Sequence, residues 1–416
     1  MKIYKYEPSF SEKKRGEVRP PLAPGVSWVQ FGEESVLYEA GPQESKPDAA
    51  PSRGARMPRA EETVTREQMY VVIQNGRLFQ QHHPEIPVLH DRGRFLLVKI
   101  DPEKARALST KQETCYGLVP LKEDHVVFDS RESSAARAPV PKIQALVNKI
   151  ERANFDSNLT KLASFPTRHS TSAGFIDAAT WARTQLKDMG YTTRSQTVTV
   201  DGGKSRNIIA EKLGKGSGAH QLVIVTAHLD SINLAGGPTA AAPGADDNGS
   251  GSAGLLEIAR VFLDHSSTHD LHFILFGGEE QGLFGSKHYV AGLSKTEKAR
   301  IRSVVNMDMI GALNSSTRSV LIEGSQLSKA VIEGLSKAAT TYTQLKVETS
   351  LQPFASDHVP FINAQIPAVL TIEGADNTNS NIHSANDTLD KIDSEIALEI
   401  LRMNVAFVAE QIGSLT

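Results

Sequence analysis

The chain has 416 residues and a formal net charge of -3 at pH 7, with 22% charged and 39% hydrophobic residues. This length predicts about two or three domains, and the composition is that of a soluble protein without a polybasic face. We therefore expect neither nucleic acid nor a membrane as a partner. The one cysteine, Cys115, excludes an intramolecular disulfide and a cysteine-based zinc cluster, so a metal site would need His, Asp and Glu ligands.

Residues 1–60 are rich in Pro, Gly, Glu and Arg and show no sustained hydrophobic periodicity. They are predicted to form an extended or partly ordered arm. The segment 1–7 lacks the apolar core of a signal peptide. No apolar run reaches the length of about 18 residues that would predict a transmembrane helix.

A small α+β domain is predicted over residues 61–130. Its strand-like runs lie at 69–73, 95–100 and 125–128, and one capped helix lies at 101–108. The polar, proline-rich segment 131–141 predicts an exposed linker. Because a protease can cut such an arginine-containing linker, one hypothesis is that residues 1–140 are an inhibitory or folding-assisting propeptide.

Residues 142–416 alternate helical and strand-like patterns, which predicts an α/β domain with a mixed, mostly parallel sheet sandwiched by helices. Helices are predicted at 143–162, 173–189, 250–262, 326–341 and from about 390, and strands at 192–200, 207–213, 221–227, 271–276, 301–307 and 366–372. The run 221–227 is apolar throughout, as in a central strand that is covered on both faces.

Three apolar strands of this domain are followed by a histidine or an acid. His228 directly follows the strand at 221–227, the pair Glu279-Glu280 follows the strand at 271–276, and Asp308 follows the strand at 301–307. Each residue alone is explained as well by a helix cap, a helix start or a structural histidine. Together they indicate a ligand site, because ligands of open α/β sheets bind at the carboxyl ends of the strands.

Further candidates lie in loops: the adjacent acids Asp246 and Asp247 in a glycine-rich loop, and His358 and His383 late in the chain. Carboxylate and imidazole ligands suit Zn²⁺, with Mn²⁺ or Co²⁺ as substitutes by ligand type. The donors outnumber the three protein ligands of a single catalytic zinc. The sequence therefore favours a site for two metal ions with a bridging carboxylate.

Residues 141–416 resemble the di-zinc aminopeptidase family, the bacterial leucyl-type exopeptidases related to glutamate carboxypeptidase and glutaminyl cyclase. The segments that carry the resemblance are His228–Ser231, Pro243–Gly251, Gly278–Ser286, Asn306–Gly311, Ser356–Phe361 and Ile382–Thr388. Their common order makes the signal far more specific than any single segment.

The resemblance implies a role for each matching residue. It implies that His228 and Asp308 bind one zinc ion, that Glu280 and His383 bind the other, and that Asp247 bridges them. Asp247 is chosen over its neighbour because the family's bridging acid stands three residues after the glycine of a Pro-Gly pair. The family also has a cis peptide bond after that acid.

The implied reaction is hydrolysis of the N-terminal residue from a peptide by a metal-bridging hydroxide. Glu279 is the implied general base, and Asp230 is the implied carboxylate that fixes the tautomer of His228. Family members also place a tyrosine near the last two motifs as an oxyanion donor, and no tyrosine stands there in this chain. Ser356 and His358 are weak alternatives for that role.

The resemblance further implies peptide substrates with a free N-terminus, and export from the cell or into the periplasm. We expect a monomer. Two alternatives stay open at this point. One is a single-zinc glutaminyl cyclase, which shares the fold. The other is a non-catalytic, receptor-like domain, which would be expected to have lost ligands or the base.

Overall fold

The computed structural model describes residues 3–7, 26–39, 64–110, 116–131 and 137–414, so that Cys115 lies outside it. The chain divides into two compact units between Arg131 and Glu132, at the start of the predicted linker. None of the helices among the described residues is long and apolar enough to cross a membrane.

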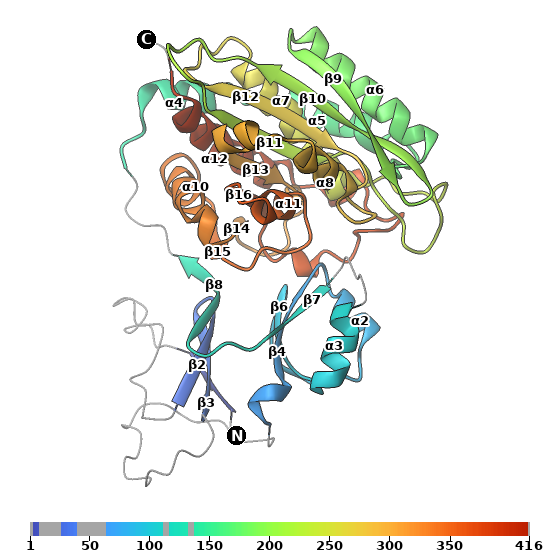
Figure 1. The fold of residues 1–416 in the computed structure, drawn as a ribbon, viewed down its shortest axis with the longest axis vertical. Helices are drawn as coiled ribbons and strands as arrows, with labels where there is room; N and C mark the ends of the chain where they lie inside the picture. The colour runs from blue at the N-terminus through green and yellow to red at the C-terminus, as the bar shows by residue number, and fades with distance from the viewer. Residues whose placement is uncertain (1–2, 8–25, 40–63, 111–115, 132–136, 415–416) are drawn as a thin grey trace. The chain divides into compact units, whose positions relative to one another are not determined.

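The N-terminal unit contains two groups of strands (Figure 1). Strands β1 (Ile3–Tyr6), β2 (Val26–Phe31) and β3 (Glu34–Glu39) pair in the order β1-β3-β2, with β8 (His125–Arg131) beside β2. A second sheet has the order β5-β6-β4-β7, and its elements are β4 (Met69–Gln74), β5 (Val88–Arg92), β6 (Phe95–Lys99), β7 (Tyr116–Pro120), α2 (Leu78–His82) and α3 (Pro102–Thr110). The segment predicted as an arm thus contributes three strands among the residues that can be described.

The C-terminal unit is built on a mixed sheet with the order β15-β14-β16-β13-β11-β12-β10-β9. Its strands are β9 (Thr192–Val200), β10 (Gly203–Lys212), β11 (Leu222–His228), β12 (Asp270–Phe276), β13 (Ile301–Met307), β14 (Ser319–Glu323), β15 (Lys346–Ser350) and β16 (Ala368–Glu373). The central strands β12, β11, β13 and β16 run parallel, and β10 and β14 are antiparallel to their neighbours β12 and β16. The predicted mixed, mostly parallel sheet is confirmed.

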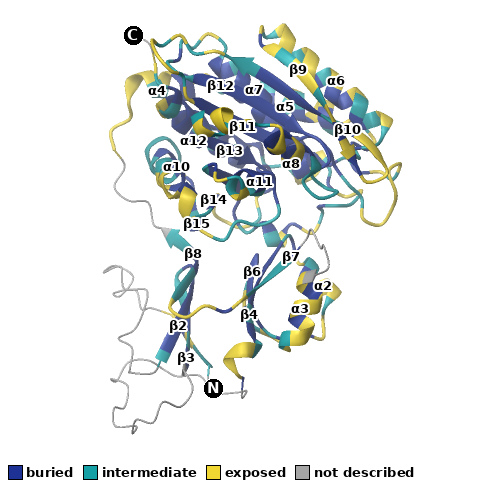
Figure 2. Cartoon of the chain, viewed as in Figure 1, coloured by how far each residue is buried: buried dark blue, intermediate teal, exposed yellow. Residues whose placement is uncertain are grey.

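Helices cover both faces of this sheet. They are α4 (Pro141–Val147), α5 (Arg152–Ala163), α6 (Ala173–Asp188), α7 (Gly251–Phe262), α8 (Phe284–Ala291), α9 (Lys295–Arg300), α10 (Lys329–Tyr342), α11 (His358–Asn363) and α12 (Ser394–Ile412). Alternate residues of β11 show the two faces: Val223 and Val225 belong to one hydrophobic cluster with residues of α5, α6, α7, α10 and α12, whereas Ile224 belongs to another with residues of α8 and α11. Strands β11, β12 and β16 are therefore buried along their whole length, and β13 is buried except at Arg302 (Figure 2).

The structure differs from the sequence-based interpretation at three points. The single helix expected at 143–162 is two helices, because the N–H of Glu151 leaves the helical pattern and donates to the Glu257 carboxylate of α7 at 2.7 Å. The glutamate pair does not begin a helix, since Gly282 and Leu283 have positive φ and α8 starts only at Phe284. Strands β14 and β15 were not predicted at all.

Candidate metal centre

The three predicted strand ends meet at one edge of the sheet. Strand β11 lies between β12 and β13 and runs parallel to both, so their carboxyl ends face the same side. His228 is the last residue of β11, Asp308 follows β13, and Glu279 and Glu280 follow β12 by a short turn. Atoms of His228, Glu279 and Asp308 that can bind a metal lie within 4.8 Å of one another.

Asp247 lies between two imidazoles. Its Oδ1 is 3.3 Å from Nε2 of His228, and its Oδ2 is 3.0 Å from Nε2 of His383. The same Nε2 of His228 is 3.2 Å from Oδ1 of Asp308, and that of His383 is 3.2 Å from Oε2 of Glu280. The Asp247 carboxylate thus presents one oxygen to the pair of His228 and Asp308. It presents the other oxygen to the pair of His383 and Glu280.

The spacing within each set fits a metal ion. Zinc bonds of about 2.0–2.2 Å in tetrahedral geometry place neighbouring ligand atoms about 3.3–3.6 Å apart. The separations of 3.0–3.3 Å in the structure are close to this. In addition, Oε1 of Glu280 is buried and has no hydrogen-bond partner among the described residues, as is expected of an atom that faces a cation.

The charges of the cluster also fit a cation. Burial and the neighbouring Asp247 carboxylate raise the pKa of Glu280 to about 7. Although burial opposes the charged form, the two imidazoles hold the pKa of Asp247 below its usual range. Likewise, despite burial, the carboxylates of Asp308 and Glu279 raise the pKa of His228 well above its usual range. Divalent cations would compensate this crowding of carboxylates.

The Glu279 carboxyl group has the surroundings of a proton acceptor. Burial raises its pKa well above the usual value, and the nearby acids Asp308, Asp357 and Glu280 raise it further while His228 lowers it. A carboxylate with a raised pKa accepts a proton more readily than a free glutamate does.

Asp230 holds the glutamate pair in place. Its carboxylate oxygens accept hydrogen bonds from the backbone N–H groups of Glu279 and Glu280, at 3.3 and 3.2 Å. Nδ1 of the His228 ring lies 3.2 Å from the backbone carbonyl of Asp230 and 3.7 Å from its carboxylate. Asp230 thus lies against both the histidine and the two glutamates.

The loop with the two acids directs them to opposite sides. Asp246 accepts hydrogen bonds from the N–H of Gly311 and the amide of Asn379, both at 2.8 Å. Only Asp247 faces the imidazoles, and the peptide bond to Asn248 is cis, as the resemblance implied. This geometry favours Asp247 as the bridging acid.

Sequence reasoning missed the function of Asp387. Its carboxylate accepts hydrogen bonds from the backbone N–H groups of both Asp246 and Asp247 at 2.9 Å, and so it holds the loop that carries the two acids. Burial and the Asp246 charge raise the pKa of Asp387 to about 8. Its position four residues after His383 was the one available signal.

The two alternative oxyanion donors have other partners. Ser356 donates to Oδ2 of Asp308 at 2.6 Å and accepts from the amide of Asn306 at 2.8 Å. The fully buried ring of His358 lies 3.5 Å from the carboxylate of Glu323. Ser356 therefore orients a candidate metal ligand.

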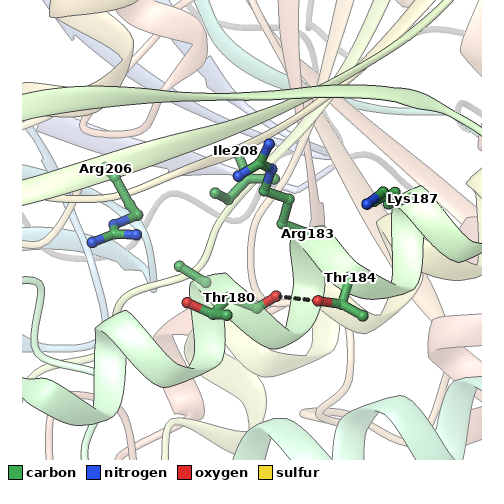
Figure 3. A pocket seen from close by; sticks show the side chains of 7 residues that line it. Thr180, Arg183, Thr184, Lys187, Arg206 and Ile208 are labelled. Carbon is green, nitrogen blue, oxygen red and sulfur yellow. Dashed lines mark hydrogen bonds between the residues drawn. The ribbon is translucent and has the colours of Figure 1, made fainter.

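A groove of about 220 Å³ lies between α6 and β10, and none of the predicted site residues lines it (Figure 3). Arg183 and Lys187 of α6 and Arg206 of β10 line it, together with Ile208 and threonines of α6. It contains no carboxylate and no histidine, so it cannot hold the chemistry predicted for the strand ends.

Comparison with known proteins identifies the family. The model of peptidase family M28 matches residues 207–408. A probable leucine aminopeptidase of Arthroderma otae is 31% identical over 278 residues, which are 64% of this chain and 75% of that protein. The chain belongs to peptidase family M28. Leucine aminopeptidase 1 of Aspergillus clavatus is 26% identical over 361 residues, covering 78% of the M28 chain and 91% of its relative.

Solved structures share the fold of this M28 peptidase. A zinc aminopeptidase from Bacillus subtilis has a TM-score of 0.56 and 20% identity, covering 63% of this chain and 95% of that one. A glutaminyl cyclase from Porphyromonas gingivalis has a TM-score of 0.52 and 21% identity, covering 63% and 99%. Both the predicted family and the predicted fold are confirmed, but the fold alone does not separate the two activities.

Proposed function

We propose that this protein is a zinc-dependent aminopeptidase that removes the N-terminal residue of peptides, with two metal ions and Glu279 as general base. One observation carries the proposal: the Asp247 carboxylate lies between His228 and His383, with one oxygen 3.3 Å and the other 3.0 Å from an imidazole nitrogen. A bridging carboxylate is the feature that distinguishes a two-metal site from a single zinc.

The predicted class of enzyme, a metallo-aminopeptidase, is confirmed by the family and by the relatives. Zinc is the metal that the family comparison supports. We assign His228 and Asp308 to one ion, Glu280 and His383 to the other, and Asp247 to both. Mn²⁺ and Co²⁺ are the substitutes that this ligand set would accept.

The reaction follows from what each side chain can do. Bound zinc lowers the pKa of water toward about 7 and polarises a carbonyl. Glu279 accepts the proton of the attacking water and returns it to the leaving amine, which its raised pKa favours. Asp230 holds Glu279 and Glu280 in register through their backbone N–H groups, so that one carboxylate can move a proton while the other stays with the metal.

The glutaminyl cyclase alternative is disfavoured by the donor set. A single zinc needs three protein ligands, and the cluster supplies a histidine and an acid on each side of Asp247. A receptor-like domain is disfavoured for the same reason, because neither the ligands nor the base is missing.

The substrate test compares three compounds: leucyl p-nitroanilide, its N-acetyl derivative and a peptide with N-terminal glutamine. We expect hydrolysis of the first and at least 100-fold less of the second, about 2.7 kcal/mol, because the blocked amine cannot be recognised. The glutamine peptide should release free glutamine. Release of pyroglutamate with intact anilide would instead establish the cyclase.

A further inference from the structure

One fully buried side chain outside the assigned ligand set, Arg168, connects the segments of the metal centre. Arg168 has 0% exposure and lies in the segment between α5 and α6. In the part of the chain that can be described, its guanidinium makes no salt bridge with a carboxylate. It donates instead to four backbone carbonyls, those of Leu162 at 3.0 Å, Leu229 at 2.8 Å, Gly244 at 2.9 Å and Pro243.

Three of these carbonyls, those of Leu229, Pro243 and Gly244, belong to segments that carry candidate ligands. Leu229 directly follows His228, and Gly244 stands three residues before Asp247. The backbone of Arg168 strengthens the connection, because its N–H donates to the hydroxyl of Ser231 and its carbonyl accepts from the N–H of Ser231. The Ser231 hydroxyl in turn donates to Ala242 at 2.7 Å. One residue therefore joins the end of β11 to the loop with the bridging acid.

The contact between the guanidinium and the loop is close. A Cβ at Gly244 would lie 3.0 Å from Nη2 of Arg168, and a Cβ at Gly249 would lie 3.6 Å from it. Gly244 also has a φ of +55°, which glycine adopts without strain. The planar guanidinium presents five fixed donors, whereas a lysine presents a single ammonium, so lysine cannot reach all four carbonyls.

The position of this charge also suits the site. Burial lowers the pKa of Arg168 to about 10, and the surrounding carboxylates Asp387, Asp230, Asp247 and Glu280 act in the opposite direction. The side chain is therefore charged at neutral pH. The guanidinium, a cation held near these carboxylates, offsets part of their mutual repulsion without occupying a metal position.

We propose that Arg168 is a positioning residue, which fixes the loop of Asp247 against the end of β11 and so holds the two metal positions at their working separation. The inference rests on the proposed function, because it takes the cluster around Asp247 as the metal centre. The inference adds a structural cause for the separation of the two metal positions. None of the assigned ligands supplies this cause by itself.

The test measures zinc affinity by chelator competition in Arg168→Lys, which keeps the charge but loses the planar set of guanidinium donors. Arg183→Lys, in the exposed groove of α6, is the matched control. We expect the zinc dissociation constant of Arg168→Lys to rise about 10–100-fold, the range seen for groups that support metal ligands. We also expect kcat to fall at limiting zinc and to recover in excess zinc, with a smaller change in KM. The control should match the wild type.

Thermal unfolding of the metal-free proteins separates positioning from general stability. A lower melting temperature with unchanged zinc affinity in folded Arg168→Lys would overturn the proposal. If that variant does not fold, Ser231→Ala decides, because it removes the hydroxyl contacts of the same junction: weaker zinc binding supports the proposal and unchanged binding overturns it. Failure of the wild type to bind zinc would instead overturn the proposed function.

Discussion

Replacing Glu279 by glutamine is expected to lower kcat/KM for an aminoacyl substrate about 10²–10⁴-fold, the usual contribution of a general acid or base. Glutamine has nearly the same shape but cannot accept the proton of the attacking water. The variant should keep the zinc content of the wild type, because the backbone N–H groups that Asp230 holds are unchanged.

Steady-state kinetics and metal analysis of the same sample check this expectation. Glu280→Gln is the matched comparison, since the adjacent acid is assigned to the metal and its loss should lower the zinc content as well. Full activity in Glu279→Gln would refute the assignment of the base. Loss of zinc from Glu279→Gln would mean that the roles of the two glutamates are reversed.

Asp247→Asn is expected to affect both metal positions at once. An amide has one oxygen and one NH₂ group, so it cannot offer an oxygen to each imidazole set. We expect reduced affinity for both ions and a fall in kcat/KM of about 10³-fold or more, which corresponds to the several kcal/mol of charge stabilisation that a metal supplies.

The neighbouring acid provides the control for this change. Asp246→Asn removes a charge from the same loop, but Asp246 faces Gly311 and Asn379 and not the imidazoles. It should lower the stability of the protein while retaining more zinc than Asp247→Asn. Titration of the metal-free variants with zinc measures this, and the opposite order would reverse the choice between the two acids.

Local pattern predicted the central sheet well because its strands are buried on both faces. The predicted strands at 221–227 and 301–307 agree with β11 and β13 to within one residue, since uninterrupted apolar runs have no competing interpretation. The break between α4 and α5 could not be predicted, because it depends on Glu257 of α7, a residue 106 positions away from Glu151.

The same difference between local sequence patterns and contacts with distant residues applies to the candidate site. Residues at strand ends, such as His228 and Asp308, could be found because the strands that carry them are recognisable. Asp387 and Arg168 were missed as supports because their partners are backbone groups of remote loops, up to 141 residues away for Asp387. Backbone donors and acceptors leave no trace in the types of the residues that carry them.

The measurement that tests the two-metal centre most directly is anomalous diffraction at the zinc edge from crystals of the zinc-loaded protein. We expect two peaks about 3.5–4 Å apart, with the Asp247 carboxylate between them. His228 and Asp308 should lie at one peak, and His383 and Glu280 at the other. A single peak, or peaks that do not touch Asp247, would contradict this arrangement.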